Sequence, residues 1–220
     1  MNNKIITALF VALLGITHSY ASDCSMQNLD AVKKDLIRYH DDGQYERDQA
    51  AVAGQALGYL KERITKATPN EKLAIVLDID ETSLSNYRDM ADMRFGGNND
   101  QINGAEAKGT DAAIKPTLEL YRYAKAHHVA VFFITGRPER FRALTEDNLL
   151  REGYKNWDGL ILKPDDYRLK SIVPYKASSR RALSKNNYII VVNMGDQLSD
   201  LAGGYSEKSF KLPNPYYFLP

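Results

Sequence analysis

The sequence lacks several features that mark particular classes of protein. Cys24 is its only cysteine, so no disulfide can form within the chain. The formal net charge is only +1, which gives no strong electrostatic preference for nucleic acid or for an anionic membrane. No internal repeat or low-complexity segment is present. A nucleic acid polymer is therefore not an expected partner.

Long hydrophobic runs are also missing. The largely apolar residues 5–16 number about twelve, too few to span a bilayer, which argues against a membrane anchor. They follow Lys4 and precede the tripeptide Ser-Tyr-Ala at 19–21, which is the three-part plan of a secretory signal peptide. We expect residues 1–21 to be removed and the protein to be periplasmic or secreted, with no stable membrane insertion after removal.

Cleavage at that point leaves residues 22–220 as the mature protein. Cys24 invites a lipoprotein interpretation, but Asp23 stands where a lipid-attachment site has a small residue. Hydrophobic residues make up 44% of the sequence, enough at this length for one sizeable core. A single domain is therefore expected.

Short apolar runs alternate with helical patterns along the chain. The helical segments keep apolar residues three and four positions apart, whereas the apolar runs are too short for helices and are typical of strands buried on both faces. This alternation predicts a parallel α/β sheet. The expected helices are 28–39, 45–66, 116–127, one opened by 135–138 and running to about 152, and 176–185; the expected strands are 73–77, 129–134, 157–162 and 188–194.

The strand at 73–77 ends abruptly in Asp78 and Asp80. Ligands of parallel sheets bind just beyond the carboxyl ends of the strands, and the alternation of side chains would project both carboxylates toward that crevice. Two carboxylates held together repel, and a cation is the usual remedy. The alternatives are a solvated turn or a calcium loop, but the glycine and distal glutamate of such a loop are missing.

Residues 135–138, Thr-Gly-Arg-Pro, follow the second strand. Backbone N–H groups at a helix N-terminus, together with a threonine hydroxyl, make a phosphate site, so Thr135 and Gly136 are candidates for binding phosphate. That Thr135 is only an N-cap is the compatible alternative. His127 and His128 precede the same strand, away from its carboxyl end, and are interpreted as a cap or a solvated pair rather than a metal site.

Four further stretches follow the two aspartates in order. They are Ile-Thr-Gly-Arg (134–137), Tyr-Lys (175–176) followed by Arg180, Gly-Asp-Gln-Leu-Ser-Asp (195–200) and Phe-Lys-Leu-Pro-Asn-Pro-Tyr-Tyr (210–217). With residues 72–82, they make the chain resemble the haloacid dehalogenase-like (HAD) superfamily. The resemblance covers roughly residues 70–217 and is to the acid phosphatase branch, which holds class B and class C bacterial acid phosphatases and plant vegetative storage proteins.

The resemblance implies a Rossmann-like three-layer core with N-terminal helices added. It also implies a flap and small cap inserted after the first strand, at about residues 83–115, that cover the phosphate site and choose the substrate. A polar, glycine-bearing segment of this length is more often functional than idle. Tyr87, Phe95, Met90 and Met93 are candidates for lining the cap; that they merely pack it onto the core is equally compatible.

Phosphoryl transfer requires a positioned group, neutralised charge and an in-line nucleophile. By resemblance, Asp78 is the nucleophile and forms an aspartyl-phosphate, and Asp80 is the general acid and then the base. Mg²⁺ is held by the Asp78 carboxylate, the Asp80 backbone carbonyl and Asp196. Asp200 orients a bound water rather than touching the metal.

Thr135 and Gly136 would hold the substrate phosphate, and Lys176 would pair with both the phosphate and Asp78. Lys163 and Lys170 lie in the same connection, but the Tyr-Lys-x-x-x-Arg context favours Lys176, where the family pattern places its lysine. One departure is Leu198, which stands where the family often has an aromatic residue. It concerns packing more than chemistry.

The second aspartate narrows the expected function. Dehalogenases and transport ATPases of the superfamily lack it, so Asp80 indicates phosphatases and phosphotransferases. We expect a magnesium-dependent acid phosphatase that hydrolyses small phosphomonoesters, nucleoside monophosphates among them. A phosphotransferase, or a catalytically weak storage or binding protein, is the alternative. Relatives that lose activity lack the nucleophile, and here Asp78 is present.

Overall fold

The computed structural model describes residues 26–98, 101, 102, 104 and 108–219, so the predicted signal peptide and Cys24 lie outside it. A five-stranded sheet has the order β5-β4-β1-β6-β7, and every neighbouring pair is parallel. β1 is the middle strand, so the aspartates that follow it emerge at the centre of the carboxyl edge. The strands are β1 (Lys72–Leu77), β4 (Ala130–Pro138), β5 (Gly159–Lys163), β6 (Tyr188–Gly195) and β7 (Lys208–Lys211).

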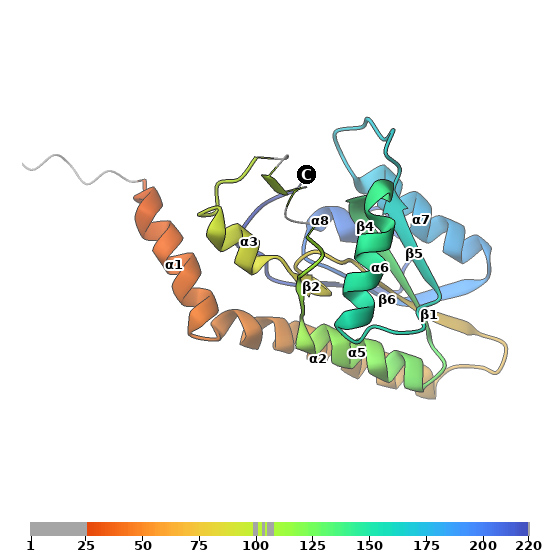
Figure 1. The fold of residues 1–220 in the computed structure, drawn as a ribbon. Helices are drawn as coiled ribbons and strands as arrows, with labels where there is room; N and C mark the ends of the chain where they lie inside the picture. The colour runs from red at the N-terminus through yellow and green to blue at the C-terminus, as the bar shows by residue number, and fades with distance from the viewer. Residues whose placement is uncertain (1–25, 99–100, 103, 105–107, 220) are drawn as a thin grey trace, which may run out of the picture.

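Helices cover both faces of this sheet (Figure 1). Along β1, Leu73, Ile75 and Leu77 face α2, α5 and α6, whereas Ala74 and Val76 face α7. Side chains of a strand alternate between the faces, so the next residue of the second set, at position 78, lies on the α7 side. The helices are α2 (Gln44–Thr65), α5 (Lys115–Ala126), α6 (Arg142–Arg151) and α7 (Val173–Lys185). The predicted parallel α/β fold is confirmed.

α1 (Leu29–Asp41) stands away from the sheet beyond the end of α2 (Figure 1). Its N-cap is Asn28, whose side chain accepts hydrogen bonds from the N–H groups of Asp30 and Ala31. Gly43, at φ 71°, makes the turn into α2. None of the described helices has both the length and the apolar character needed to cross a membrane.

The segment predicted as a cap is built of small elements. β2 (Leu84–Ser85) and β3 (Ala112–Ala113) pair antiparallel, and α3 (Tyr87–Asp92) lies between them in the chain. Residues 99, 100, 103 and 105–107 of this segment lie outside the described part. The segment is thus an insertion between β1 and α5, and its role as a cap stays a prediction.

β4 is longer than predicted. It continues through residues 135–138 because Pro138 still pairs with Lys163 of β5, across a register irregularity after Ile134. A short 3-10 helix (Glu139–Phe141) follows, and α6 begins only at Arg142. The prediction that residues 135–138 open a helix is therefore wrong, and the alternative that Thr135 is an N-cap is wrong with it.

One other boundary differs from the prediction, and one strand was not predicted. α7 begins at Val173, with a proline in its first turn, so Lys176 lies one turn inside the helix. β7 was not predicted, because only Phe210 of its four residues is buried and the run carries little apolar signal. Its register beside β6 brings Lys211 opposite Gly195.

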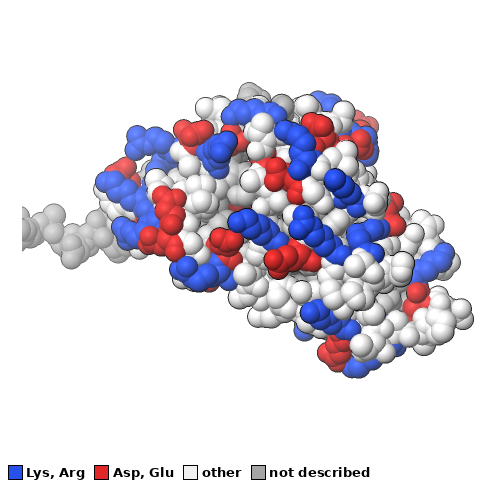
Figure 2. All heavy atoms as spheres, turned by 60° about the horizontal axis from the view of Figure 1, so that its bottom comes forward, with Lys and Arg blue, Asp and Glu red and all other residues white. Residues whose placement is uncertain are grey.

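Charged side chains of both signs are interspersed on the face shown in Figure 2, and no broad field of one sign covers it. This mixture agrees with the formal net charge of +1. Long-range attraction of a polyanion requires a sustained positive field. The face shown in Figure 2 therefore gives no reason to add a nucleic acid polymer to the expected partners.

Candidate active site

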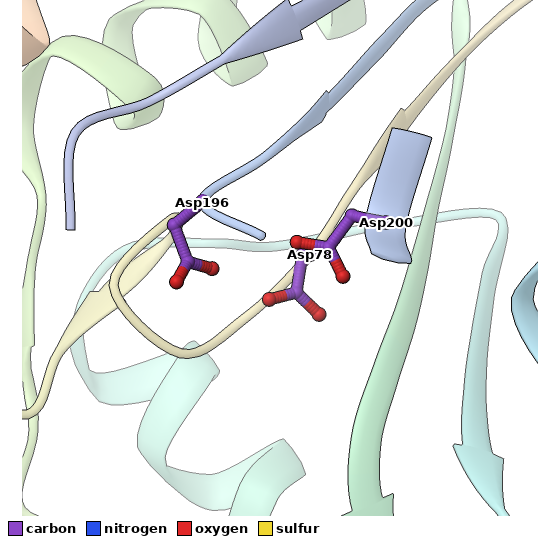
Figure 3. Close-up of side chains that lie close together, drawn as sticks. All are labelled: Asp78, Asp196 and Asp200. Carbon is purple, nitrogen blue, oxygen red and sulfur yellow. The ribbon is translucent and has the colours of Figure 1, made fainter. Parts of the chain in front are cut away.

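Three aspartate carboxylates converge at the carboxyl edge of the sheet (Figure 3). Asp78 follows β1, Asp196 follows the neighbouring β6, and Asp200 lies in α8 (Leu198–Leu201). One oxygen from each lies within 4.8 Å of the others, and all three residues are at most 6% exposed. Carboxylates this close and this dry repel one another, so an all-oxygen set of this kind fits a hard divalent cation.

Gly195 permits the close approach of Asp200. A Cβ at Gly195 would lie 2.4 Å from the Asp200 carboxylate, so any other residue would push that side chain away. Asp200 Oδ2 accepts a hydrogen bond from Gln197 N at 2.8 Å, as part of a capping box. Asp196 lies before α8, and Asp200 lies in the first turn of that helix.

Lys176 places a positive charge among these carboxylates. Its Nζ donates to Asp78 Oδ1 at 2.6 Å and to Asp200 Oδ1. Burial alone would lower the pKa of Lys176, but the negative charges of Asp200 and Asp78 raise it above its ordinary value, so the amine stays protonated. In the described part of the chain, the lysine against Asp78 is Lys176 rather than Lys163 or Lys170.

One lysine does not balance the buried negative charge. Burial raises the pKa of Asp78 well above its ordinary value, and the charge of Asp200 adds to the effect. Burial, again with Asp200, raises the pKa of Asp196 to about 6. A cation between these groups would favour their ionised forms and reverse both shifts.

Asp80 has a different environment. Arg137 grips its carboxylate, with Nη2 donating to Oδ1 at 2.7 Å and Nε at 3.1 Å from Oδ1 and 3.2 Å from Oδ2. Asn86 Nδ2 donates to the same Oδ1 at 2.8 Å. Burial opposes ionisation, but the charge and hydrogen bonds of Arg137 prevail and lower the pKa of Asp80. The two aspartates of the motif are therefore electrostatically unlike.

Neutral donors fix Asp196 on both oxygens. Thr82 Oγ1 donates to Oδ1 at 3.2 Å, and Oδ2 accepts from Gln197 Nε2 at 2.6 Å and Asn214 Nδ2 at 2.7 Å. Asn214 belongs to the C-terminal stretch 210–217. The chain after β7 thus returns to the site and orients a candidate metal ligand, as outer partners of metal sites do.

Glu81 stabilises the turn that follows Asp80. It is fully buried, with a left-handed φ of 49°. Asn86 N donates to its Oε1 at 2.5 Å, and the hydroxyl of Tyr45, from the first turn of α2, donates to its Oε2. Burial raises the pKa of Glu81 to about 8. The N-terminal part of α2 is therefore bonded directly to the residue that follows Asp80.

Thr135 and Gly136 lie on β4, the strand that neighbours β1. β1 and β4 pair with Leu77 opposite Phe133, so the next residues of the two strands share the carboxyl edge. The Thr135 hydroxyl accepts a hydrogen bond from Arg137 N at 3.1 Å. A Cβ on Gly136 would meet no atom within 4 Å, so the space beside it is open. Their binding of phosphate stays a prediction.

Tyr87 and Phe95 belong to an aromatic cluster that joins the insertion to α1, α2 and the C-terminal chain. Tyr87 stacks on His40 with ring centroids 3.3 Å apart, and Phe95 stacks on Tyr216 at 5.6 Å. Tyr87 also lines a cleft of about 560 Å³ bounded by α2, α3 and β3. Both of the weighed roles, packing and lining, are thus compatible with the geometry.

Sequence reasoning missed several residues of this site. Arg137 lies in the stretch 134–137, Glu81 in 72–82 and Asn214 in 210–217. Each is a polar residue inside a motif that carries the family resemblance, and that position was the signal that could have identified it. Asp111, which also binds Arg137, comes from the weakly patterned insertion and carries no such signal. The histidine pair is not at the site, since the ring of His127, the C-cap residue of α5, stacks on Tyr123.

Comparison with known proteins places this geometry in a family. The family model described as HAD superfamily, subfamily IIIB (acid phosphatase) matches residues 15–220. The chain belongs to the subfamily IIIB acid phosphatases of the HAD superfamily. The resemblance inferred from the motifs is confirmed. That the carboxylate cluster at the carboxyl edge of the sheet is the active site stays a prediction.

Proteins similar to this chain include one named as an acid phosphatase and one named as a vegetative storage protein. Acid phosphatase 1 of Solanum lycopersicum is 38% identical over 148 residues, which are 66% of this chain and 58% of that protein. Vegetative storage protein 1 of Arabidopsis thaliana is 32% identical over 204 residues, 88% of this chain and 74% of that one. The class C acid phosphatase of Bacillus anthracis has the same fold, with a TM-score of 0.72 at 22% identity over 86% of each chain.

Proposed function

We propose that the protein is a phosphomonoesterase that hydrolyses small phosphate esters through an aspartyl-phosphate on Asp78. The observation that carries this proposal is the contact of Lys176 with Asp78 at the centre of the carboxyl edge. The ammonium keeps a buried carboxylate available as a nucleophile and adds positive charge where a phosphoryl group would arrive. The open space beside Gly136 leaves room for that group.

In the first step an oxygen of Asp78 attacks phosphorus, and the bond from phosphorus to the leaving-group oxygen breaks. Asp80 gives its proton to that oxygen, and the alcohol departs. In the second step Asp80 takes a proton from water as the water attacks phosphorus, which releases inorganic phosphate and restores Asp78. Asp80 thus ends each cycle protonated, as it began. Because Arg137 lowers the pKa of Asp80, the protonated form has to be favoured by an acidic pH and by the negative charge of the arriving phosphate.

The metal is proposed to be Mg²⁺, held by Asp78, the backbone carbonyl of Asp80 and Asp196. The three converging carboxylates offer only oxygen ligands, which suit a hard divalent cation. When bound, such an ion neutralises charge on the phosphoryl group. Asp200, already engaged by Lys176 and Gln197 N, would orient a water on the ion.

Export to the periplasm or beyond remains part of the proposal, on the strength of residues 1–21. The substrate is proposed to be a small phosphomonoester, with residues 83–115 as the cap that selects it. Nucleoside monophosphates are the first candidates to test. A storage role is the second candidate function, because vegetative storage proteins are among the relatives.

A panel of phosphomonoesters tests the function. The mature protein is assayed with Mg²⁺ and with a chelator, beside Asp78→Asn and, as a matched control, Asp165→Asn, whose carboxylate is exposed in a surface pair with Arg140. We expect turnover that requires metal and Asp78 but not Asp165. Absence of turnover by the metal-loaded wild type on every ester would favour storage, and full activity in chelator would refute the metal.

A further inference from the structure

Arg137 connects the proposed acid–base residue to the inserted segment. Its Nη2 donates to Asp80 Oδ1 and to Asp111 Oδ2, both at 2.7 Å. Asp80 follows β1, whereas Asp111 belongs to the insertion, directly before β3. The side chain of Arg137 is 0% exposed and that of Asp111 is 4% exposed. Water therefore does not replace these contacts. Removal of Asp111 would leave the buried charge of Arg137 paired with Asp80 alone, and would change the orientation of the guanidinium that holds Asp80.

Asp111 is itself fixed by α6. Asn148 Oδ1 accepts a hydrogen bond from Asp111 N at 3.0 Å, and Asn148 Nδ2 donates to Asp111 O at 2.7 Å. Both hydrogen bonds are buried, so moving the backbone of Asp111 would leave buried polar groups without partners. The carboxylate of Asp111 is consequently a fixed point against which the planar guanidinium of Arg137 is oriented.

The contacts on Asp80 distinguish its two oxygens. Oδ1 accepts from Asn86 Nδ2 and from two nitrogens of Arg137, whereas the bond to Oδ2 from the described residues is the longer one, from Arg137 Nε at 3.2 Å. The side chain remains 16% exposed. A general acid needs one oxygen within reach of the substrate, and Oδ2 is the oxygen left for that task.

We propose that Asp111, acting through Arg137, is a positioning residue for Asp80. It fixes the orientation in which Oδ2 gives a proton to the leaving-group oxygen and later takes one from water. The insertion then contributes to the chemistry as well as to substrate choice. This inference rests on the proposed phosphatase function and goes beyond it, because it assigns a catalytic contribution to a segment expected to cover the site and choose the substrate.

The test compares kcat/KM on two substrates, because kcat/KM reports the first step alone. Nitrophenyl phosphate has a leaving group that departs without a proton, whereas an alkyl phosphate needs the acid. Asp111→Ala should lower kcat/KM on the alkyl ester at least about tenfold more than on the aryl ester, a part of the total help that a general acid gives. If Asp111→Ala does not fold, Asp111→Asn replaces it in the same comparison, because it keeps the shape of the side chain and removes the charge.

Two further variants separate positioning from general damage. In the Asp80→Asn background, Asp111→Ala should leave the aryl-to-alkyl ratio unchanged, because the residue through which it acts is gone. Asp158→Ala is the matched control: Asp158 is a partly exposed carboxylate outside the insertion, paired with Lys125 at 2.6 Å instead of Arg137. This control should not change the ratio in the wild-type background.

Equal losses on both esters for Asp111→Ala would overturn the inference, and so would a further selective loss in the double variant. Either outcome would leave the proposed function standing, provided that the wild type hydrolyses both esters and Asp80→Asn shows the selective loss. If the wild type hydrolyses neither ester, the proposed function fails instead. The two failures are thus distinguishable.

Discussion

At the residue scale, the site is defined by an excess of buried negative charge. Asp78 and Asp200 share the ammonium of Lys176, and Asp196 has neutral donors on both oxygens. Arg137 pairs with Asp80 and Asp111. Removing charges from water is costly unless they are paired, so the arrangement favours binding of a further cation.

Asp196→Asn should weaken Mg²⁺ binding and activity together, because it removes one of the two carboxylates that are proposed to hold the ion. The loss of affinity should exceed the roughly 10- to 100-fold that losing an outer partner of a metal ligand costs. Isothermal titration calorimetry on the wild type and the variant measures it, with Asp165→Asn as the surface control. Unchanged Mg²⁺ affinity in Asp196→Asn would show that the ion, if bound, sits elsewhere.

At the element scale, α2 and the insertion support the turn after β1. Tyr45→Phe removes the hydroxyl that bonds buried Glu81 and should lower the free energy of unfolding by about 1–3 kcal/mol. Tyr39→Phe is the control, because its hydroxyl bonds Asp48 in a part-buried surface position, where substitutions typically cost about 0.5 kcal/mol or less. Urea unfolding at pH 7 compares them. Equal losses of unfolding free energy in the two variants would mean that the buried hydrogen bond from Tyr45 to Glu81 stabilises the fold no more than the surface one does.

The aromatic cluster gives a prediction about specificity. Tyr87→Ala or Phe95→Ala should change the ranking among phosphomonoesters more than the rate on a small aryl phosphate, because both residues come from the predicted cap and Tyr87 lines the cleft beside it. Steady-state kinetics on the panel of esters measures the ranking. Uniform losses on all esters would mean that these rings only pack the insertion against His40 and Tyr216.

Element by element, strong patterns predicted the fold and weak ones did not. The buried strand before Asp78 and the stripe of α2 were identified because apolar runs and helical spacing are local properties. The extension of β4 to Pro138 depends on pairing with Lys163 of β5. This pairing is a long-range contact that local sequence patterns do not encode. β7 was not predicted for a similar reason, because it forms by pairing with the edge of β6.

The same limit applies to the site. Asp78, Asp196 and Lys176 could be predicted because they stand in motifs at strand ends or in a family context, and the structure brings them together. The grip of Arg137 on Asp80 joins residues far apart in the sequence. The role of Asp111 could not be predicted from the sequence. A carboxylate in a polar insertion cannot be told from a solvent-exposed one until its partner, Arg137, is known.

At the scale of the whole molecule, stability in chelator should depend on pH. Burial raises the pKa of Glu81 from 4.5 to about 8, and those of Asp196 and Asp111 from 3.8 to about 6. Between those limits the folded protein binds more protons than the unfolded chain, so the free energy of unfolding falls as the pH rises. Thermal unfolding midpoints should therefore decrease from pH 5 to pH 8.

Saturating Mg²⁺ should reduce this decrease, because the ion stabilises the ionised aspartates. Calorimetry at four pH values, with chelator and with Mg²⁺, supplies both curves. A midpoint that rises from pH 5 to pH 8 in chelator, or an identical slope with Mg²⁺, would contradict this account of the buried carboxylates.

The division of labour between Asp78 and Asp80 is the central claim, and rapid mixing with nitrophenyl phosphate tests it most directly. Asp80→Asn should release a burst of about one equivalent of nitrophenolate and then turn over slowly, because the aryl group leaves without the acid while hydrolysis of the aspartyl-phosphate lacks its base. Asp78→Asn should give neither burst nor turnover. A burst from Asp78→Asn, or no burst from Asp80→Asn with equal loss of kcat/KM on aryl and alkyl esters, would contradict the roles assigned to them.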